Sequence, residues 1–242
     1  MVCVFAHFCR CLLARKLLPR NLLSVKNLKR IASQNRDAFE AFSEYYKDAV
    51  IIVERKVNLP SLKSTFILDV FRDRTWAPLL IGSVDVHHVL VREFFSNAVV
   101  EGDHVNYWVR GKEFTISAMS IQNFLQIRLV ILESSLPYDK RKLLVVSVIA
   151  LVLGGERLKK CLLTTNFSLE MRILVYTMIF NLFPVSNLTN LSHPRALFLH
   201  DLSKKKDIDI CAHIYYLITK CVNKKITQMT LSFTGLTMLI LH

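Results

Sequence analysis

Apolar residues recur at helical spacing in the first half of the chain. The pattern over residues 39–53 predicts a core-facing helix, which Asn58-Leu59-Pro60 brings to an end. A second helix is expected over residues 86–98, and Trp76 before it is expected to anchor the core. The inward-facing positions are Phe39, Phe42, Tyr46, Ala49, Val50 and Val53 in the first helix and Leu90, Phe94 and Ala98 in the second.

Between residues 104 and 116 the period changes from helical to alternating. Two alternating runs flank Arg110-Gly111-Lys112, which predicts a β-hairpin with Gly111 supplying the positive φ of its turn. Ser117 is then expected to cap a further helix with its hydroxyl. The alternating residues are Val105, Tyr107, Val109, Phe114 and Ile116, and the helix carries Ile121, Phe124 and Leu125.

Three more helices are expected in the second half. Ser168 caps the first, which Pro184 ends; Ser192 caps the second, which runs to about Ser203; and Asp207 opens the third. Acidic residues early and lysines late in the third helix agree with the helix dipole. The inward positions of the first and third helices are Met171, Leu174, Val175, Met178 and Leu182, then Ile210, Ile214, Leu217, Ile218 and Cys221.

Residues 126–167 combine a polar loop, an apolar run at 143–153 and a glycine pair that would stop a helix, so a buried helix flanked by loops is expected. This run and residues 173–183 are each about 11 residues long, whereas a membrane-spanning helix needs about 20. No transmembrane span is therefore expected. The whole pattern predicts a mainly α-helical single domain with one short β-hairpin near residues 104–116.

Charge separates the first residues from the rest. The formal net charge is +13, and no acidic residue occurs in the first 36 positions. We interpret residues 1–37 as a basic extension, loosely ordered or partly helical, and residues 38–242 as the helical domain. Such an extension suits nucleic acid, anionic lipid or an import sequence, and an unselected solvated tail is the other interpretation. Its basic residues are Arg10, Arg15, Lys16, Arg20, Lys26, Lys29, Arg30 and Arg36.

The six cysteines are scattered, with no spacing typical of a disulfide framework or a zinc knuckle, and we interpret them as reduced thiols. The N-terminus lacks an uninterrupted apolar stretch followed by a small-residue cleavage site. These features favour an intracellular location, nuclear or cytoplasmic, over a mitochondrial or secreted one.

An ordered set of short motifs extends from residue 54 to residue 237. They are Glu54-Arg55-Lys56-Val57, Arg74-Thr75-Trp76, the segments 91–98, 107–112, 114–117, 121–125, 167–170, 181–186 and 195–199, then Asp207-Ile208-Asp209-Ile210 and Phe233-Thr234-Gly235-Leu236-Thr237. Their order and spacing resemble the plant family named Putative plant transposon protein, over roughly residues 38–240. The resemblance implies a retrotransposon-associated domain of unassigned activity, and an end just past a family motif suggests a copy truncated at its C-terminus.

No enzyme class fits the residues. A nuclease-type transposase, the weakest alternative, needs three carboxylates on a mixed sheet, whereas the acidic residues here lie on helical patterns or loops. His87 and His88 are adjacent and point apart, and Cys211 and His213 are about 200° apart around a helix. We expect no catalytic residue, no metal site and no cofactor.

Clusters of basic residues make nucleic-acid binding the most specific functional hypothesis, against solvated lysines at helix ends and loops. The alternatives are a module that binds an element-encoded or host protein, and a decayed element without activity. Basic clusters on one contiguous face would favour nucleic acid, and dispersed clusters a protein partner. Arg110-Gly111-Lys112 is either an exposed contact or simply a turn. The candidate contacts are Lys140, Arg141, Lys142, Arg157, Lys159 and Lys160, with further clusters at residues 204–206 and 224–225.

Overall fold

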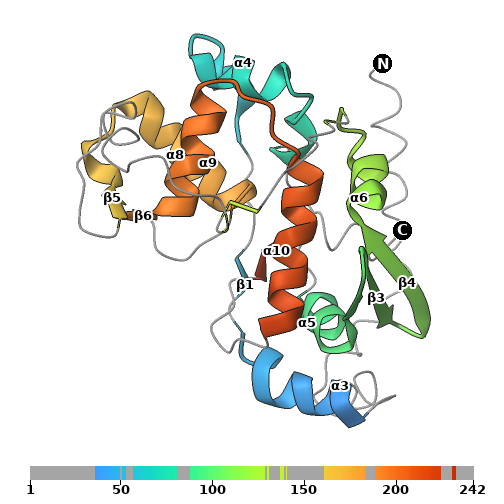
Figure 1. Ribbon diagram of the computed structural model, residues 1–242. Helices are drawn as coiled ribbons and strands as arrows, with labels where there is room; N and C mark the ends of the chain where they lie inside the picture. Colours follow the sequence, from blue (N-terminus) through green and yellow to red (C-terminus); the bar gives the residue numbers. More distant parts are fainter. Residues whose placement is uncertain are drawn as a thin grey trace.

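The computed structural model describes residues 36–49, 51–52, 57–80, 88–128, 130, 137–138, 140, 161–183, 189–224 and 231–232. Helix α10 (Ile210–Lys224) lies at the centre of this part of the chain (Figure 1). On one side are α5 (His88–Asn97), α6 (Ala118–Leu125) and a small sheet, and on the other are α8 (Leu169–Asn181) and α9 (His193–Ser203). The expected mainly helical architecture is thus found among the described residues.

The first predicted helix ends earlier than the apolar pattern of residues 39–53. It consists of α3 (Arg36–Ala41) and a π-helical turn (Phe42–Tyr46), and the Phe42 carbonyl accepts a hydrogen bond from Lys47 N–H at 2.8 Å. Ala49 is buried as expected, but Ile51–Ile52 form a strand, β1, in place of a last helical turn. β1 pairs in parallel with β7 (Leu231–Ser232), a long-range contact that no local periodicity encodes.

Helix α5 matches its prediction, with Leu90 and Phe94 buried, while its expected first two residues lie outside the described ones. Trp76 is 2% exposed, which confirms it as a core residue. Helix α4 (Phe66–Arg72), which was not predicted, lies between two 3₁₀ turns (Leu59–Leu62 and Ala77–Leu79). Both turns contain proline in their first positions, where its missing N–H costs no helical hydrogen bond.

The predicted hairpin is part of a larger sheet. β3 (His104–Val109) pairs with β4 (Lys112–Ser117) as expected, but β2 (Val99–Glu101) adds a third antiparallel strand. Arg110 and Gly111 both have positive φ, 53° and 81°, as a two-residue type I′ loop requires. Lys112 pairs with Val109, so it belongs to the strand and the loop is one residue shorter than predicted.

Two further sheets correct the expectation of a single hairpin. β5 (Cys161–Leu163), which continues into a 3₁₀ turn (Thr164–Asn166), pairs antiparallel with β6 (Asn190–Ser192), and β1 pairs with β7. The predicted buried helix at 143–153 and the glycine pair after it lie outside the described residues.

Helix starts follow the predicted caps only in part. Ser117 Oγ accepts from Ser120 N–H at 3.1 Å, and Ser168 Oγ accepts from Met171 N–H at 3.3 Å. Ser192 precedes α9, but its hydroxyl accepts from Arg195 Nη1 and caps no backbone N–H. At α10 the cap is Asp209, whose carboxylate accepts from Ala212 N–H at 2.8 Å, so the helix begins after Asp207.

The described side chains share one hydrophobic core on both sides of α10. Its buried positions on α8 and α10 include Leu174, Met178, Ile214 and Ile218, which lie on the predicted inward faces. Within the described part of the chain, no helix is both long enough and apolar enough to cross a bilayer.

Candidate nucleic-acid interface

Basic residues from three separate segments meet near the start of α10. Figure 1 shows α4 beside the loop that joins α9 to α10. Arg74, just after α4, joins the two: its guanidinium donates to the Val70 carbonyl at 3.0 Å and to the Lys206 carbonyl at 2.8 Å. The same guanidinium lies 5.4 Å from the Trp76 ring, and burial lowers the pKa of Arg74. Arg74 therefore holds the loop in place.

The loop itself presents Lys204, Lys205 and Lys206 to solvent. Lys205 Nζ lies 3.2 Å from Asp73 Oδ2, which adds a second link between the loop and the end of α4. Lys206 Nζ lies 3.0 Å from Asp201 Oδ1, and Lys206 N–H donates to the Asp201 carbonyl at 3.0 Å. The three lysines thus have a fixed backbone although their side chains are exposed.

Asp201 also contacts the third segment, which contains Tyr138 and Lys140. Its carboxylate is only 5% exposed; Oδ2 accepts from the Tyr138 hydroxyl at 3.3 Å, and Oδ1 lies 3.1 Å from His200 Nδ1. The Tyr138 ring packs 5.0 Å from Phe198 between ring centroids. Lys140, two residues after Tyr138, is exposed. The buried carboxylate therefore draws the segment of Lys140 to the same end of α9 as the loop lysines.

We call the following group of six residues the basic patch: Arg72, Arg74, Lys140, Lys204, Lys205 and Lys206. In the part of the chain that the structure describes, four carboxylates lie beside its six cations, those of Asp69, Asp73, Asp201 and Asp207, an excess of two positive charges, 6 − 4. Among the described residues, neither Lys140 nor Lys204 forms an ion pair.

A pocket of about 380 Å³ adjoins the basic patch at the N-terminus of α10, between α6 and the β2–β3 turn. Asp103 and Asp209 are its carboxylates and Arg128 is its cation. The backbone N–H of Arg128 donates to Thr75 Oγ1 at 2.9 Å, next to Arg74 of the patch. The pocket and the patch are therefore neighbours.

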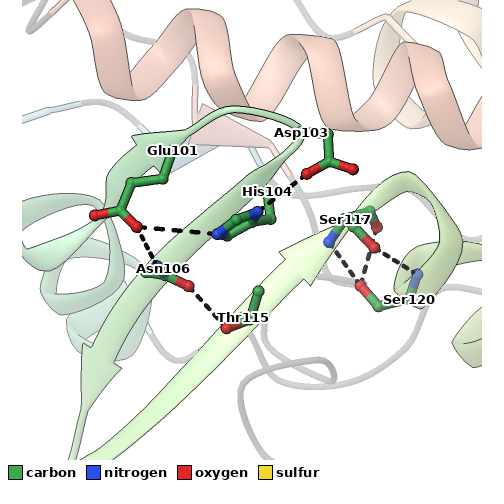
Figure 2. Close-up of polar contacts among 7 residues, drawn as sticks. All are labelled: Glu101, Asp103, His104, Asn106, Thr115, Ser117 and Ser120. Carbon is green, nitrogen blue, oxygen red and sulfur yellow. Dashed lines mark hydrogen bonds and ion pairs between the residues drawn. The ribbon is translucent and has the colours of Figure 1, made fainter.

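Polar contacts fix the sheet edge that borders this pocket (Figure 2). His104 Nδ1 lies 3.1 Å from Asp103 Oδ1, and this contact lowers the pKa of Asp103. On β3, Asn106 donates to Glu101 at 2.8 Å and accepts from Thr115 at 2.8 Å, so one side chain ties three strands together. The Ser117 cap then starts α6 at the pocket wall.

The predicted contact at the turn Arg110-Gly111-Lys112 lies away from the pocket. β3 leaves the pocket at His104 and runs six residues, close to 20 Å at about 3.3 Å per residue, before reaching Arg110. There the carboxylate of Glu93, 2% exposed, accepts from Arg110 N–H at 2.9 Å, and its Oε2 lies 3.4 Å from Arg110 Nε. Burial raises the pKa of Glu93, against the opposing effect of Arg110. The Arg110 guanidinium is engaged in the turn, while Lys112 is exposed.

Sequence reasoning identified part of the basic patch. Lys140 and Lys204–206 were predicted as members of basic clusters. Arg74 was noted only within the motif Arg74-Thr75-Trp76, and neither Arg72 nor Arg74 was predicted as a contact, because their role depends on the loop beside them. The 15-residue helix α10 starts near the patch and ends at Lys224, and Lys225 lies outside the described residues. Arg141, Lys142, Arg157, Lys159 and Lys160 lie outside the described residues.

Within the described ranges, no group of three or more His, Cys, Asp or Glu residues is placed to hold a metal ion. Cys211 and Cys221 are free thiols, and burial raises the pKa of each to about 12.

Comparison with known proteins gives one family. No curated protein matches the chain, and no solved structure matches it. The family model described as Putative plant retrotransposon-related domain matches residues 72–242, which include the sheet, the basic patch and the pocket. The match begins later than the expected resemblance, leaving α3 and β1 outside it. Because it covers well over half of the sequence, the chain belongs to this plant retrotransposon-related family.

Proposed function

We propose that this protein is a non-enzymatic nucleic-acid-binding domain of plant retrotransposon origin, in which the basic patch holds backbone phosphates. The observation that carries the proposal is that residues 72–74 and 204–206 contact each other, and that Tyr138, two residues before the exposed Lys140, contacts Asp201 at the same end of the fold. Such convergence distinguishes a phosphate-binding surface from solvated lysines dispersed over helix ends.

The internal contacts assign different roles to these cations. Arg74 and Lys206 hold the loop to α4 and α9, whereas Lys140 and Lys204 have no described ion-pair partner that a phosphate would have to displace. Lysine ammonium groups suit phosphate as point charges and carry no base preference by themselves. The proposed binding is therefore independent of sequence at the patch and strongly dependent on salt.

The contacts of the most buried acidic group in the patch support a non-enzymatic role. Asp201, the most buried carboxylate of the patch, is engaged by Tyr138, His200 and Lys206, and it does not line the neighbouring pocket. A carboxylate held in this way serves as an anchor for the lysine loop.

The test is fluorescence anisotropy of the full chain with a labelled 20-base-pair DNA of random sequence, between 50 and 200 mM salt. The double variant Lys140→Ala/Lys204→Ala should bind less tightly. The slope of log K against log salt should be shallower by about 1.8, because each lost phosphate contact contributes about 0.9. The matched control is Lys47→Ala/Lys112→Ala, two exposed lysines outside the patch.

Equal losses in the two double variants would place binding on the general positive charge and refute the patch. No binding by the wild type at 50 mM salt would refute nucleic-acid binding altogether, and would favour the alternative role of a module that binds an element-encoded or host protein.

A further inference from the structure

The pocket beside the basic patch has the wrong charge for a phosphate. Two carboxylates, Asp103 and Asp209, and a single guanidinium, Arg128, line it. A strand held on the patch would pass close by, because Arg128 N–H donates a hydrogen bond to Thr75, the residue after Arg74, and Asp209 follows Lys206 by three positions. A group of a nucleic acid other than its phosphate would have to enter the pocket.

The two carboxylates supply strong hydrogen-bond acceptors to the lining. Asp209 uses Oδ1 to cap α10, which leaves Oδ2, and the Asp103 side chain is 99% exposed beside the cavity. On two lining residues, a buried polar atom has no hydrogen-bond partner among the described residues: Gln122 Oε1 and the Tyr215 hydroxyl oxygen. Burial raises the pKa of Tyr215, and the nearby charge of Asp103 adds to this effect. An acceptor-rich lining fits a ligand that presents N–H groups.

The remaining lining is apolar and the size is adequate. Met119 is 55% exposed at the start of α6, and Ala118, Val130 and Ile210 complete an apolar surface. A volume of about 380 Å³ lies within the range of small-molecule sites, roughly 300–1,000 Å³. One flat heteroaromatic ring with donors along an edge would use both the apolar surface and the acceptors.

We propose that this pocket accepts a single unpaired guanine, whose adjacent N1–H and exocyclic amino group donate to the carboxylate of Asp103. The inference rests on the proposed function, because the patch must first hold the strand. Uracil, with one N–H between two carbonyls, fits an acceptor-rich lining poorly. Pairing in a duplex occupies the guanine edge, and single-stranded bases are the ones that proteins bind in pockets.

The test uses the full chain and labelled ten-nucleotide RNAs, one of uridine alone and one with a single central guanosine. We expect the guanosine strand to bind at least fivefold more tightly, as one bidentate base contact provides. Asp103→Asn should abolish this preference and leave uridine-strand affinity within twofold of the wild type. Glu113→Gln, an exposed carboxylate on β4, is the matched control and should retain the preference.

The outcomes separate the two proposals. If the guanine preference is absent, or persists in Asp103→Asn, the proposed guanine site is overturned. Binding of the uridine strand would still support the proposed role of the basic patch. Failure of both strands to bind overturns the proposed function. Binding of a labelled lysine-rich decapeptide that depends on Asp103, with no nucleotide preference, would reassign the pocket to a protein partner.

Discussion

Replacing Glu93 by alanine tests how the hairpin is attached to the core. Glu93 lies on α5, 2% exposed, and its carboxylate contacts the backbone and the side chain of Arg110 in the β3–β4 loop. No described group donates a hydrogen bond to its Oε2, which lies 3.4 Å from Arg110 Nε, so the hydrogen bond from Arg110 N–H is the main contact that the variant removes. The variant should loosen the turn without altering the strands' own ladder.

The magnitude follows from three terms. A hydrogen bond to a charged acceptor contributes about 1.5–3 kcal/mol, and the lost methylene about 0.8 kcal/mol. Removing the desolvated carboxylate offsets part of this loss, because burial already disfavours the ionised form and raises the pKa of Glu93. We expect the free energy of unfolding to fall by about 2–3 kcal/mol, which lowers Tm by about 4–12 °C for a domain of this size.

The assay is urea denaturation followed by circular dichroism, with Glu113→Ala on exposed β4 as the control, expected within about 0.5 kcal/mol of the wild type. The Glu93→Gln variant adds a pH test. Because the pKa of Glu93 is raised in the folded state, its protonated form stabilises the fold below the ordinary carboxyl range, and this stability is lost as the pH rises through the folded-state pKa. Stability of Glu93→Gln relative to the wild type should therefore rise as the pH increases above about 4, the ordinary carboxyl range. A Glu93→Ala variant as stable as the Glu113→Ala control would refute the reasoning.

Two other substitutions test local geometry. Gly111→Ala should lower the free energy of unfolding, measured by urea denaturation, by about 1–2 kcal/mol. The cost is conformational, because φ is 81° and no atom lies within 4 Å of the added Cβ. Gly111→Asn should cost less, since asparagine tolerates this conformation better, and equal costs would contradict the explanation. Ser117→Ala should cost about 1 kcal/mol through the lost cap of α6, whereas Ser192→Ala, which caps no N–H, should stay within about 0.5 kcal/mol in the same measurement. A reversed order of the two serine variants would refute the cap assignment.

Local signals in the sequence predicted the elements that local interactions determine. The hairpin was found because Gly111 and the alternating residues act within 14 positions, and α8 because Ser168 and its apolar face lie together in the chain. Helix α4 was missed since seven residues give too few turns for a clear period. β2 was missed because three residues carry almost no alternation.

Long-range contacts set the limit of the sequence analysis. The helical pattern at 39–53 predicted no strand, because the partner of Ile51 is Leu231, 180 positions away. The candidate site was anticipated as separate lysine clusters, but their convergence depends on a buried aspartate, Asp201, that binds Tyr138 63 residues upstream. The pocket had no sequence signal, since its two carboxylates come from a β-turn and from a helix cap more than 100 residues apart.

The parallel pairing of β1 with β7 bears on the order in which the chain acquires its structure during synthesis. Residues 51–52 leave the ribosome long before residues 231–232 exist, so β1 must wait unpaired while the intervening helices form. Contacts with such a large sequence separation slow folding, because the loop between them has to close first. Closure of this ladder is therefore expected to be a late step, and any copy of the element interrupted before residue 231 would leave an exposed strand edge, a known starting point for aggregation.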